Sequence, residues 1–284
     1  MNYRHAFHAG NFADVVKHAV LALVLDHLAR KAAPFFVLDT HAGTGLYDLA
    51  GLPAGKTGEW REGIGRILAK PSPPAALSPY LDAVRAANPA GELRWYPGSP
   101  ALAQALTRPQ DRIALVELHP EDGDDLKRRF SRDRRVGVHR MDGYAALKGL
   151  LPPPERRGLA LIDPPFEVRD ETARLCKALA QACRRWSTGI YLVWYPIKAR
   201  PAIDRLHADL AMLGLPPTLA AEVLVRSDDD PSRLNGSGLA VVNPPWTLDA
   251  TLAELLPWLA EALAAPEGGT GAGHRLEWLV GENA

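Results

Sequence analysis

The chain has 284 residues, of which 47% are hydrophobic and 23% are charged, and its 33 basic side chains equal its 33 acidic ones. This composition predicts a folded globular protein with a large core and argues against a disordered chain. Because the net charge is zero, any nucleic-acid partner has to bind a local basic patch. Candidate patches lie at 127–135, 156–157, 184–185 and 198–200.

The first element in chain order is a helix that follows Asn11. Asn11 can cap it, and apolar residues between Val15 and Leu28 recur at helical spacing. Charged and imidazole side chains within this stretch argue against a membrane span, and the N-terminus lacks the apolar core of a signal peptide. Judged from the residues alone, Lys17 and His18 line the polar edge of this helix.

A strand over 35–39 runs into a glycine loop at 40–45 that contains His41. A strand followed by G-x-G is typical of folds whose backbone approaches a cofactor closely, whether a nicotinamide dinucleotide or a methyl donor. The dinucleotide pattern would place a third glycine near position 48, where the chain has Asp48, so that interpretation is disfavoured. His41 either contacts the cofactor or faces water.

Residues 48–98 do not continue the alternation of strands and helices. Apolar residues at helical spacing on both sides of the proline-rich stretch 71–74 predict an inserted helical subdomain. Immediately afterwards, Ser99 is expected to cap a helix that runs through Leu106, with Pro100 in its first turn. A helix start at the carboxyl edge of a sheet is also a binding position, so Ser99 is a candidate site residue.

Acidic residues follow the next two predicted strands. The strand over 113–116 ends at Glu117, whose carboxylate can accept from both hydroxyls of a ribose. The strand over 135–139 precedes Asp142, which can accept from an adenine amino group, and Gly143, whose backbone N–H can approach the ring. The sheet is then completed by helices near 171–185 and 199–213 and by strands over 189–194, 221–225 and 238–242.

The stretch 159–166 is the strongest candidate for the catalytic motif of the chain. Its four apolar residues predict a buried strand, which two prolines end because neither can donate to a ladder, so Asp163 is delivered at the carboxyl edge. An exocyclic amino nitrogen is a poor nucleophile because its lone pair is delocalised. Asp163 and the Pro164 carbonyl can accept its two hydrogens while Phe166 stacks on the ring. This is the Asp/Asn-Pro-Pro-aromatic pattern of amino methyltransferases that use S-adenosylmethionine; a strand that ends in a proline turn is the structural alternative.

A second copy of this pattern, at 243–246, also follows an apolar strand. Chain order decides between the two copies. The glycine loop, Glu117, Asp142 and Asp163 fall at successive strand ends, in the order expected of a fold that binds S-adenosylmethionine. The copy at Asn243 would require a circularly permuted chain, so we interpret it as a structural strand terminator. The glycine-rich run 268–273 follows a helix and Pro266, and is interpreted as a flexible turn.

Six motifs carry a resemblance to a known family: they lie at residues 3–18, 39–43, 96–100, 117–120, 161–165 and 194–196. Together they resemble the RlmJ family of bacterial 23S ribosomal RNA adenine-N6 methyltransferases over nearly the whole chain. The resemblance implies an α/β fold over residues 1–284. This would be a Rossmann-like class I S-adenosylmethionine-dependent methyltransferase sheet with the inserted helical subdomain at 48–98.

The same resemblance implies roles for individual residues. It implies that the methyl donor, S-adenosylmethionine, is bound by His18, His41, Ser99, Glu117, Asp142, Gly143 and Asp163. Asp163 is also implied to be catalytic. Tyr3 matches the aromatic residue of the family that meets the target adenine, beside Pro164 and Phe166. Phe166 stands where a tyrosine is common, which preserves stacking but removes a hydroxyl.

The predicted activity is methyl transfer to N6 of a specific adenine in 23S ribosomal RNA, with the base turned into the pocket. The enzyme is expected to be a cytoplasmic monomer that acts before full subunit assembly and needs no metal ion. The two cysteines, Cys176 and Cys183, fit neither a zinc site nor a disulfide framework, which indicates buried thiols in a reducing compartment.

Three alternatives remain open at this point. The same fold can methylate a DNA adenine or a protein glutamine amide, since both reactions use the Asp/Asn-Pro-Pro-aromatic pattern. A non-catalytic RNA-binding protein can retain the fold. A nicotinamide oxidoreductase is the third, and it is disfavoured by Asp48 and by the absence of any use for the 163–166 motif in hydride transfer.

Overall fold

The computed structural model of the chain describes residues 5–265 and 271–281. Its centre is an eight-stranded sheet with the strand order β10-β8-β9-β7-β6-β1-β4-β5. Strands β1, β4, β5, β6 and β7 are parallel, β9 is antiparallel to both of its neighbours, and β10 is antiparallel to β8. The strands are β1 (Phe36–Asp39), β4 (Arg112–Val116), β5 (Val136–His139), β6 (Gly158–Ile162), β7 (Ile190–Ile197), β8 (Thr218–Leu224), β9 (Gly236–Val242) and β10 (Gly273–Val280).

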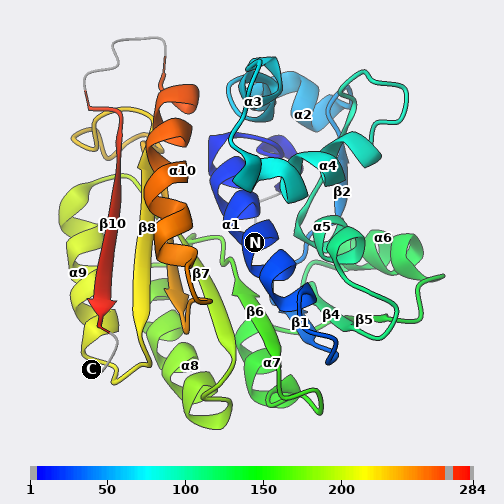
Figure 1. The fold of residues 1–284 in the computed structure, drawn as a ribbon, viewed down its shortest axis with the longest axis vertical. Coiled ribbons are helices and arrows are strands. Elements are labelled where there is room, and N and C mark those ends of the chain that lie inside the picture. Colours follow the sequence, from blue (N-terminus) through cyan, green and yellow to red (C-terminus); the bar gives the residue numbers. More distant parts are fainter. Residues whose placement is uncertain (1–4, 266–270, 282–284) are drawn as a thin grey trace.

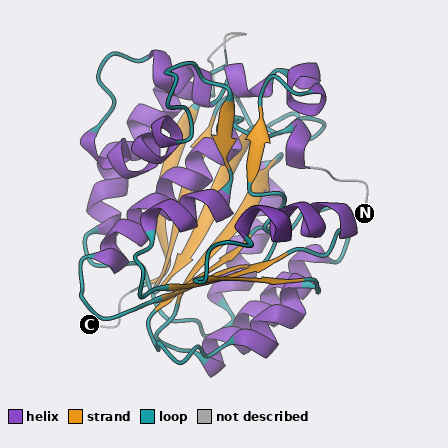
Figure 2. Cartoon of the chain, turned by 90° about the vertical axis from the view of Figure 1, so that its right-hand side faces the viewer, coloured by secondary structure: helices purple, strands orange, loops and turns teal. Residues whose placement is uncertain are grey.

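Helices cover both faces of this sheet (Figures 1 and 2). Each face has its own apolar cluster, and successive residues of a strand alternate between them: Val37 of β1 belongs to one cluster and Leu38 to the other. One cluster includes α1 (Phe12–Ala29), α4 (Ser78–Ala86), α5 (Ser99–Leu106), α6 (Pro120–Phe130) and α10 (Leu248–Leu263). The other includes α7 (Gly143–Leu150), α8 (Glu171–Arg185) and α9 (Arg200–Ala211). The predicted α/β architecture is confirmed.

The segment predicted as a helical insertion packs against α1 and α10, above one end of the sheet (Figure 1). Its base is a two-stranded antiparallel sheet, which the sequence did not suggest, formed where Leu46 pairs with Pro97 and Asp48 with Trp95. Between these strands the chain is mainly helical. The elements are β2 (Leu46–Asp48), α2 (Leu52–Thr57), η2 (Glu59–Arg61), α3 (Ile64–Ala69), η3 (Ala75–Leu77), α4 and β3 (Trp95–Pro97).

Several predicted boundaries differ from the structure. Ser99 is the first residue of α5 rather than its cap; the cap position belongs to Gly98, and no side chain caps the helix. β8 begins three residues before the expected strand, and β7 continues to Ile197. Of the glycine-rich run 268–273, residues 268–270 lie outside the described residues, and Gly273 begins β10, an edge strand that was not predicted. No helix in the described ranges is both long enough and apolar enough to cross a membrane.

Gly158 permits the close pairing of β6 with β1. It has a φ of 148°, and a Cβ added there would lie 1.9 Å from the Phe36 carbonyl oxygen. Gly158→Ala is therefore expected to lower the free energy of unfolding by about 2 kcal/mol or more, because backbone would have to move. Gly149→Ala is the matched control, since a Cβ there meets no atom within 4 Å and the residue lies inside α7. Urea unfolding of both variants measures the difference; equal stability would contradict this role.

Candidate active site

The loops that follow β1 and β6 meet near the middle of the sheet. The strand order reverses between these two strands, since β4 and β5 lie beyond β1 whereas β7 lies beyond β6. At such a reversal, the crevice outside the carboxyl ends of the strands is the usual ligand site. The Thr40 amide donates to the Leu161 carbonyl at 3.0 Å, and the Ala42 amide donates to the Val116 carbonyl at 2.9 Å. These two bonds hold the glycine loop, which follows β1, against the ends of β6 and β4.

One cavity at this crevice, here called the donor cavity, is lined by five of the seven residues predicted to bind the methyl donor: His18, His41, Ser99, Glu117 and Asp163. The Glu117 carboxylate accepts from the Gly43 amide at 2.8 Å and from the His119 amide at 2.7 Å. Its orientation is therefore set by one amide of the glycine loop and one amide of its own loop. The structure thus brings together residues from five separate segments: α1, the loop after β1, the start of α5, and the ends of β4 and β6.

The remaining two predicted donor residues lie behind the glycine loop and do not line the donor cavity formed by the described residues. Asp142 caps α7 by accepting from the Ala145 amide at 2.9 Å, and its other oxygen lies 3.3 Å from Arg174. A Cβ on Gly143 would lie 2.5 Å from the Thr40 carbonyl oxygen. Glycine at this position therefore lets α7 approach the loop that shapes the cavity.

Burial shifts the pKa values of three groups at this crevice. It lowers the pKa of His18 to about 3 and the pKa of His41 to about 4, so both imidazoles are neutral at pH 7. It also raises the pKa of Asp39 to about 6, against the Ser99 hydroxyl and the His41 amide, which lower it. Asp39 Oδ2 is buried and, among the described residues, has no hydrogen-bond partner. Asp39 itself is not among the residues that line the donor cavity.

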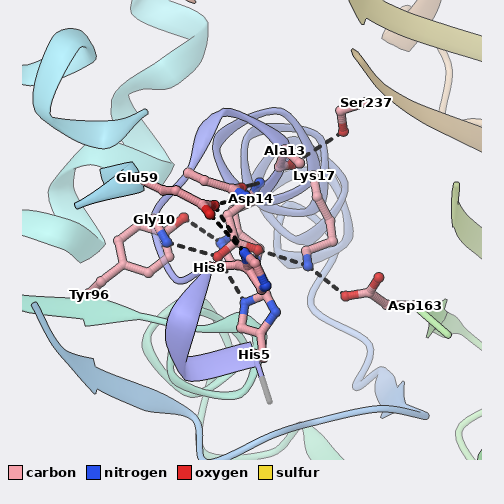
Figure 3. Close-up of polar contacts among 12 residues, drawn as sticks. His5, His8, Gly10, Ala13, Asp14, Lys17, Glu59, Tyr96, Asp163 and Ser237 are labelled. Atoms are coloured by element: carbon pink, nitrogen blue, oxygen red, sulfur yellow. Dashed lines mark hydrogen bonds and ion pairs between the residues drawn. The ribbon is translucent and has the colours of Figure 1, made fainter. Parts of the chain in front are cut away.

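Lys17 and Asp14 connect α1 to the Asp163 carboxylate (Figure 3). Lys17 Nζ lies 2.5 Å from Asp163 Oδ2 and 2.9 Å from Asp14 Oδ1, while His5 Nε2 lies 2.9 Å from Asp14 Oδ2. Burial opposes the charge of Lys17, but Asp14 and Asp163 outweigh it and raise its pKa above the ordinary value. Burial likewise opposes the ionised form of Asp14, yet His5, Lys17 and His18 hold its pKa well below the usual range. A fixed ammonium therefore faces Asp163.

The prediction that Lys17 and His18 line a polar helix edge is wrong. They are only 4% and 1% exposed, because α1 packs against β9 and against α4, α5 and α10. His18 Nδ1 lies 2.7 Å from Tyr96 Oη in β3, a partner that is distant in sequence. The sequence offers one signal for the role of Lys17. Asp14 lies three residues before it, a spacing that places both side chains on the same helix face.

Phe166 and Trp194 form an aromatic wall beside Asp163. Their ring centroids are 5.9 Å apart in an edge-to-face arrangement, and the Trp194 indole donates to Ser237 Oγ at 3.0 Å. Phe166 has a φ of 51°, which is uncommon for a bulky residue and turns the chain sharply after the two prolines. Both rings line a second cavity of about 980 Å³, here called the large cavity. Lys17, Asp163 and Trp194 line both cavities, so the Asp163 carboxylate lies at their boundary.

Of the other two predicted substrate residues, the structure describes Pro164 but not Tyr3. Pro164 lines the donor cavity, whereas Tyr3 lies outside the described residues, so its contact with the target adenine stays a prediction. His5, in the 3₁₀ turn η1 (His5–Phe7), lines both cavities. The sequence reasoning did not single out His5, Asp14 or Lys17 as site residues.

The second Asp/Asn-Pro-Pro-aromatic copy, at residues 243–246, lies at the amino ends of the parallel strands, opposite to the crevice. Because β9 runs antiparallel to β7, its carboxyl end is beside the start of β7, where Val242 pairs with Tyr191. The Asn243 side-chain amide donates to the Ser187 carbonyl at 2.8 Å and to the Gly189 carbonyl at 2.7 Å. Trp246 is 80% exposed. Asn243 therefore ties two chain segments together, far from the crevice.

His8 links the N-terminal segment to the insertion, because its Nδ1 lies 3.0 Å from both carboxylate oxygens of Glu59. The Glu59 hydrogen bond raises the pKa of His8, although burial opposes it. The resulting contribution to stability is fully present below pH 6.5 and is lost as the pH rises through the raised value. Glu59→Gln is expected to lower the pKa of His8 and to remove this pH dependence. NMR titration of the imidazole measures the shift, and an unchanged midpoint would contradict the assignment.

A doubly wound sheet, a cavity at its switch point and an Asp-Pro-Pro-Phe motif at the end of β6 define a Rossmann-like class I methyltransferase. The family model described as "Ribosomal RNA large subunit methyltransferase D, RlmJ" matches residues 32–280. The chain belongs to this family.

Individual relatives agree over the full length. The chain is 44% identical over 283 residues to Ribosomal RNA large subunit methyltransferase J of Escherichia coli (strain K12), which covers 99% of this chain and 100% of that relative. It is likewise 44% identical, with the same coverage, to the protein of that name from Haemophilus influenzae. A solved structure from Legionella pneumophila has a TM-score of 0.87 at 33% identity, covering 95% of this chain and 98% of that chain.

Proposed function

We propose that this chain transfers a methyl group from S-adenosylmethionine to N6 of a specific adenine in 23S ribosomal RNA. The observation that carries the proposal is the position of Asp163, at the boundary between the donor cavity and the large cavity. A group there can face a methyl donor on one side and an acceptor base on the other. Family membership and the names of the relatives support ribosomal RNA of the large subunit as the substrate.

The residues of the donor cavity fit S-adenosylmethionine. Glu117, fixed by two backbone amides, retains acceptor capacity for the ribose hydroxyls. The neutral imidazole of His41 can pack beside an adenine without competing charge. When bound, S-adenosylmethionine supplies an electrophilic methyl group on a sulfonium. The donor needs no further activation by a metal ion.

On the acceptor side, the proposed role of Asp163 is to accept one hydrogen of the N6 amino group while the Pro164 carbonyl accepts the other. This arrangement favours a pyramidal nitrogen with an exposed lone pair. Phe166 stacks on the adenine ring and limits its rotation, so that positioning provides much of the rate. Lys17 holds the Asp163 carboxylate in one orientation through the 2.5 Å contact. When nitrogen bonds to the methyl carbon and the carbon–sulfur bond breaks, Asp163 receives the proton that leaves N6.

The proposal includes a monomeric cytoplasmic enzyme that acts on 23S RNA before the large subunit is fully assembled. Assembly would bury many bases, and a base turned out of its RNA context must first be accessible. Equal methylation of free 23S RNA and of intact large subunits would contradict this part of the proposal, without affecting the assigned chemistry.

The experiment that tests the function uses 23S RNA from cells that lack this gene. Purified protein and labelled S-adenosylmethionine are expected to methylate one adenine, which mass spectrometry of nuclease fragments would map as N6-methyladenosine. Double-stranded DNA and glutamine-containing peptides are the parallel acceptors. Transfer to either of these but not to the RNA would overturn the substrate assignment. Failure to bind S-adenosylmethionine in calorimetry would instead support a non-catalytic RNA-binding protein.

A further inference from the structure

The large cavity extends well beyond the aromatic wall at Asp163. Its volume of about 980 Å³ lies at the upper end of the ~300–1,000 Å³ typical of sites for whole small molecules, so one stacked base leaves much of it open. The part farther from Asp163, here called the distal half, lies between α9 and the loop 225–235 that joins β8 to β9. Its apolar wall consists of Ala199, Ala202, Ile203 and Leu206 from the α9 segment, with Pro231 and Leu234 from the loop.

The charges of the large cavity are divided between its two sides. Lys198, Arg226 and Arg233 line the distal half. The carboxylates of Glu59 and Glu62 line the side formed by the insertion, where Glu59 contacts His8 and Glu62 pairs with Arg66; Glu167 lies beside the aromatic wall. The loop 225–235 also carries Asp228, Asp229 and Asp230, but these aspartates are not among the residues that line the large cavity. Inside the cavity, a phosphate would therefore meet carboxylates on the insertion side and cations on the distal side.

The loop that carries these cations is held firmly against the end of β7. Asn235 is fully buried, and its side-chain amide donates to the Lys198 carbonyl at 2.8 Å and to the Asp230 carbonyl at 2.7 Å. Its backbone amide also donates to the Ile197 carbonyl at 2.8 Å. In addition, Arg200 at the start of α9 contacts Asp228 of the loop at 2.8 Å. The spacing between the cations and Asp163 is thus set before any ligand binds, which lowers the entropic cost of binding.

We propose that the distal half binds the nucleotide adjacent to the target adenine in the RNA strand. The neighbouring base packs on the apolar wall of α9, while its phosphate contacts Lys198 and Arg233. An apolar surface for the base beside cations for the backbone is the combination that single-stranded nucleic acids require. This inference rests on the proposed function. It deepens that function by assigning the direction in which the RNA strand leaves the target base, away from Glu59 and Glu62.

The test is steady-state methylation of in vitro transcribed 23S RNA by the double variant Lys198→Gln/Arg233→Gln. Both side chains are exposed, so their replacement leaves the core unchanged. The variant is expected to raise the KM for RNA by about tenfold or more at physiological salt, with kcat and the KM for S-adenosylmethionine unchanged. The slope of log KM against log salt should become shallower by about 0.7 for each phosphate contact that is lost. Ala202→Trp, which places a large ring on the wall, should raise the same KM without changing the salt slope.

Lys148→Gln is the matched control, because Lys148 is also an exposed lysine but lies on α7, away from the large cavity. If the double variant and this control have the same KM for RNA and the same salt slope, the inference is overturned while the proposed function stands. If the wild-type protein does not methylate 23S RNA, the proposed function fails. Filter binding of the same transcript by the same variants then still tests whether Lys198 and Arg233 contact phosphates.

Discussion

Asp163→Ala is expected to lower kcat for methyl transfer to 23S RNA by at least about 100-fold, while S-adenosylmethionine still binds. The loss follows because the N6 amino group would have one acceptor fewer, and no other carboxylate lies at the boundary between the two cavities as the described residues form it. The fold should survive, since Lys17 keeps Asp14 as a partner at 2.9 Å. Labelled methyl transfer measures kcat, and calorimetry with S-adenosylmethionine measures donor binding.

Asp163→Asn separates the acceptor role of this residue from its charge. Asparagine keeps one carbonyl oxygen and belongs to the same Asp/Asn-Pro-Pro-aromatic pattern, so this variant should retain more activity than the alanine variant. It would, however, weaken the contact with the Lys17 ammonium, which is made to a charged oxygen at 2.5 Å. Near-wild-type turnover by Asp163→Ala would show that Asp163 is not the acceptor. Loss of donor binding in that variant would assign Asp163 to the donor cavity alone.

The sequence predicted the parts of the site that follow strands. The glycine loop, Glu117 and Asp163 each come directly after a buried apolar run, and a parallel sheet brings such positions to one edge. The same logic explains why the copy at Asn243 is not in the crevice. It follows β9, which is antiparallel, so its strand end lies at the other edge. From the sequence, the order of the motifs along the chain was the argument against this copy. In the structure, the antiparallel direction of β9 is sufficient to exclude it from the crevice.

Other features could not be predicted because they depend on packing between distant segments. Lys17 meets Asp163 across 146 residues, and local helix periodicity alone assigned it to a polar edge. Ser99 is a residue type that often caps helices, but Gly98 occupies the cap position, and the Ser99 hydroxyl is instead one of the groups that lower the pKa of the buried Asp39. β10 was not predicted because it is an edge strand in which none of the eight residues is buried, so its sequence shows only weak alternation. In each case, tertiary contacts override the local pattern.

Asp14→Asn is expected to destabilise the protein by about 3 kcal/mol, because Asp14 is fully buried and its charge is the partner of both the Lys17 ammonium and His5. Asparagine matches aspartate in shape and can still accept from the Gly10 amide, so the change removes mainly charge. Asp14 has a lowered pKa in the folded state. Its contribution to stability is therefore present above the ~3.9 of an unfolded aspartate and is lost as the pH falls through the folded value. Urea unfolding between pH 2 and pH 5 should show that the variant lacks this acid-dependent loss.

The double variant Asp14→Asn/Lys17→Met distinguishes a structural role of this pair from a functional one. Methionine has a length similar to that of lysine and carries no charge, so the double variant leaves no buried ammonium to be compensated. It is expected to recover part of the stability that Asp14→Asn loses, with a coupling free energy of about 1–3 kcal/mol between the two sites. Methyl transfer should fall below that of Asp14→Asn, because only the double variant deprives Asp163 of the ammonium that orients it. If the double variant recovers stability and methylates RNA as fast as Asp14→Asn, Lys17 acts only by holding α1 in place and has no separate role toward Asp163.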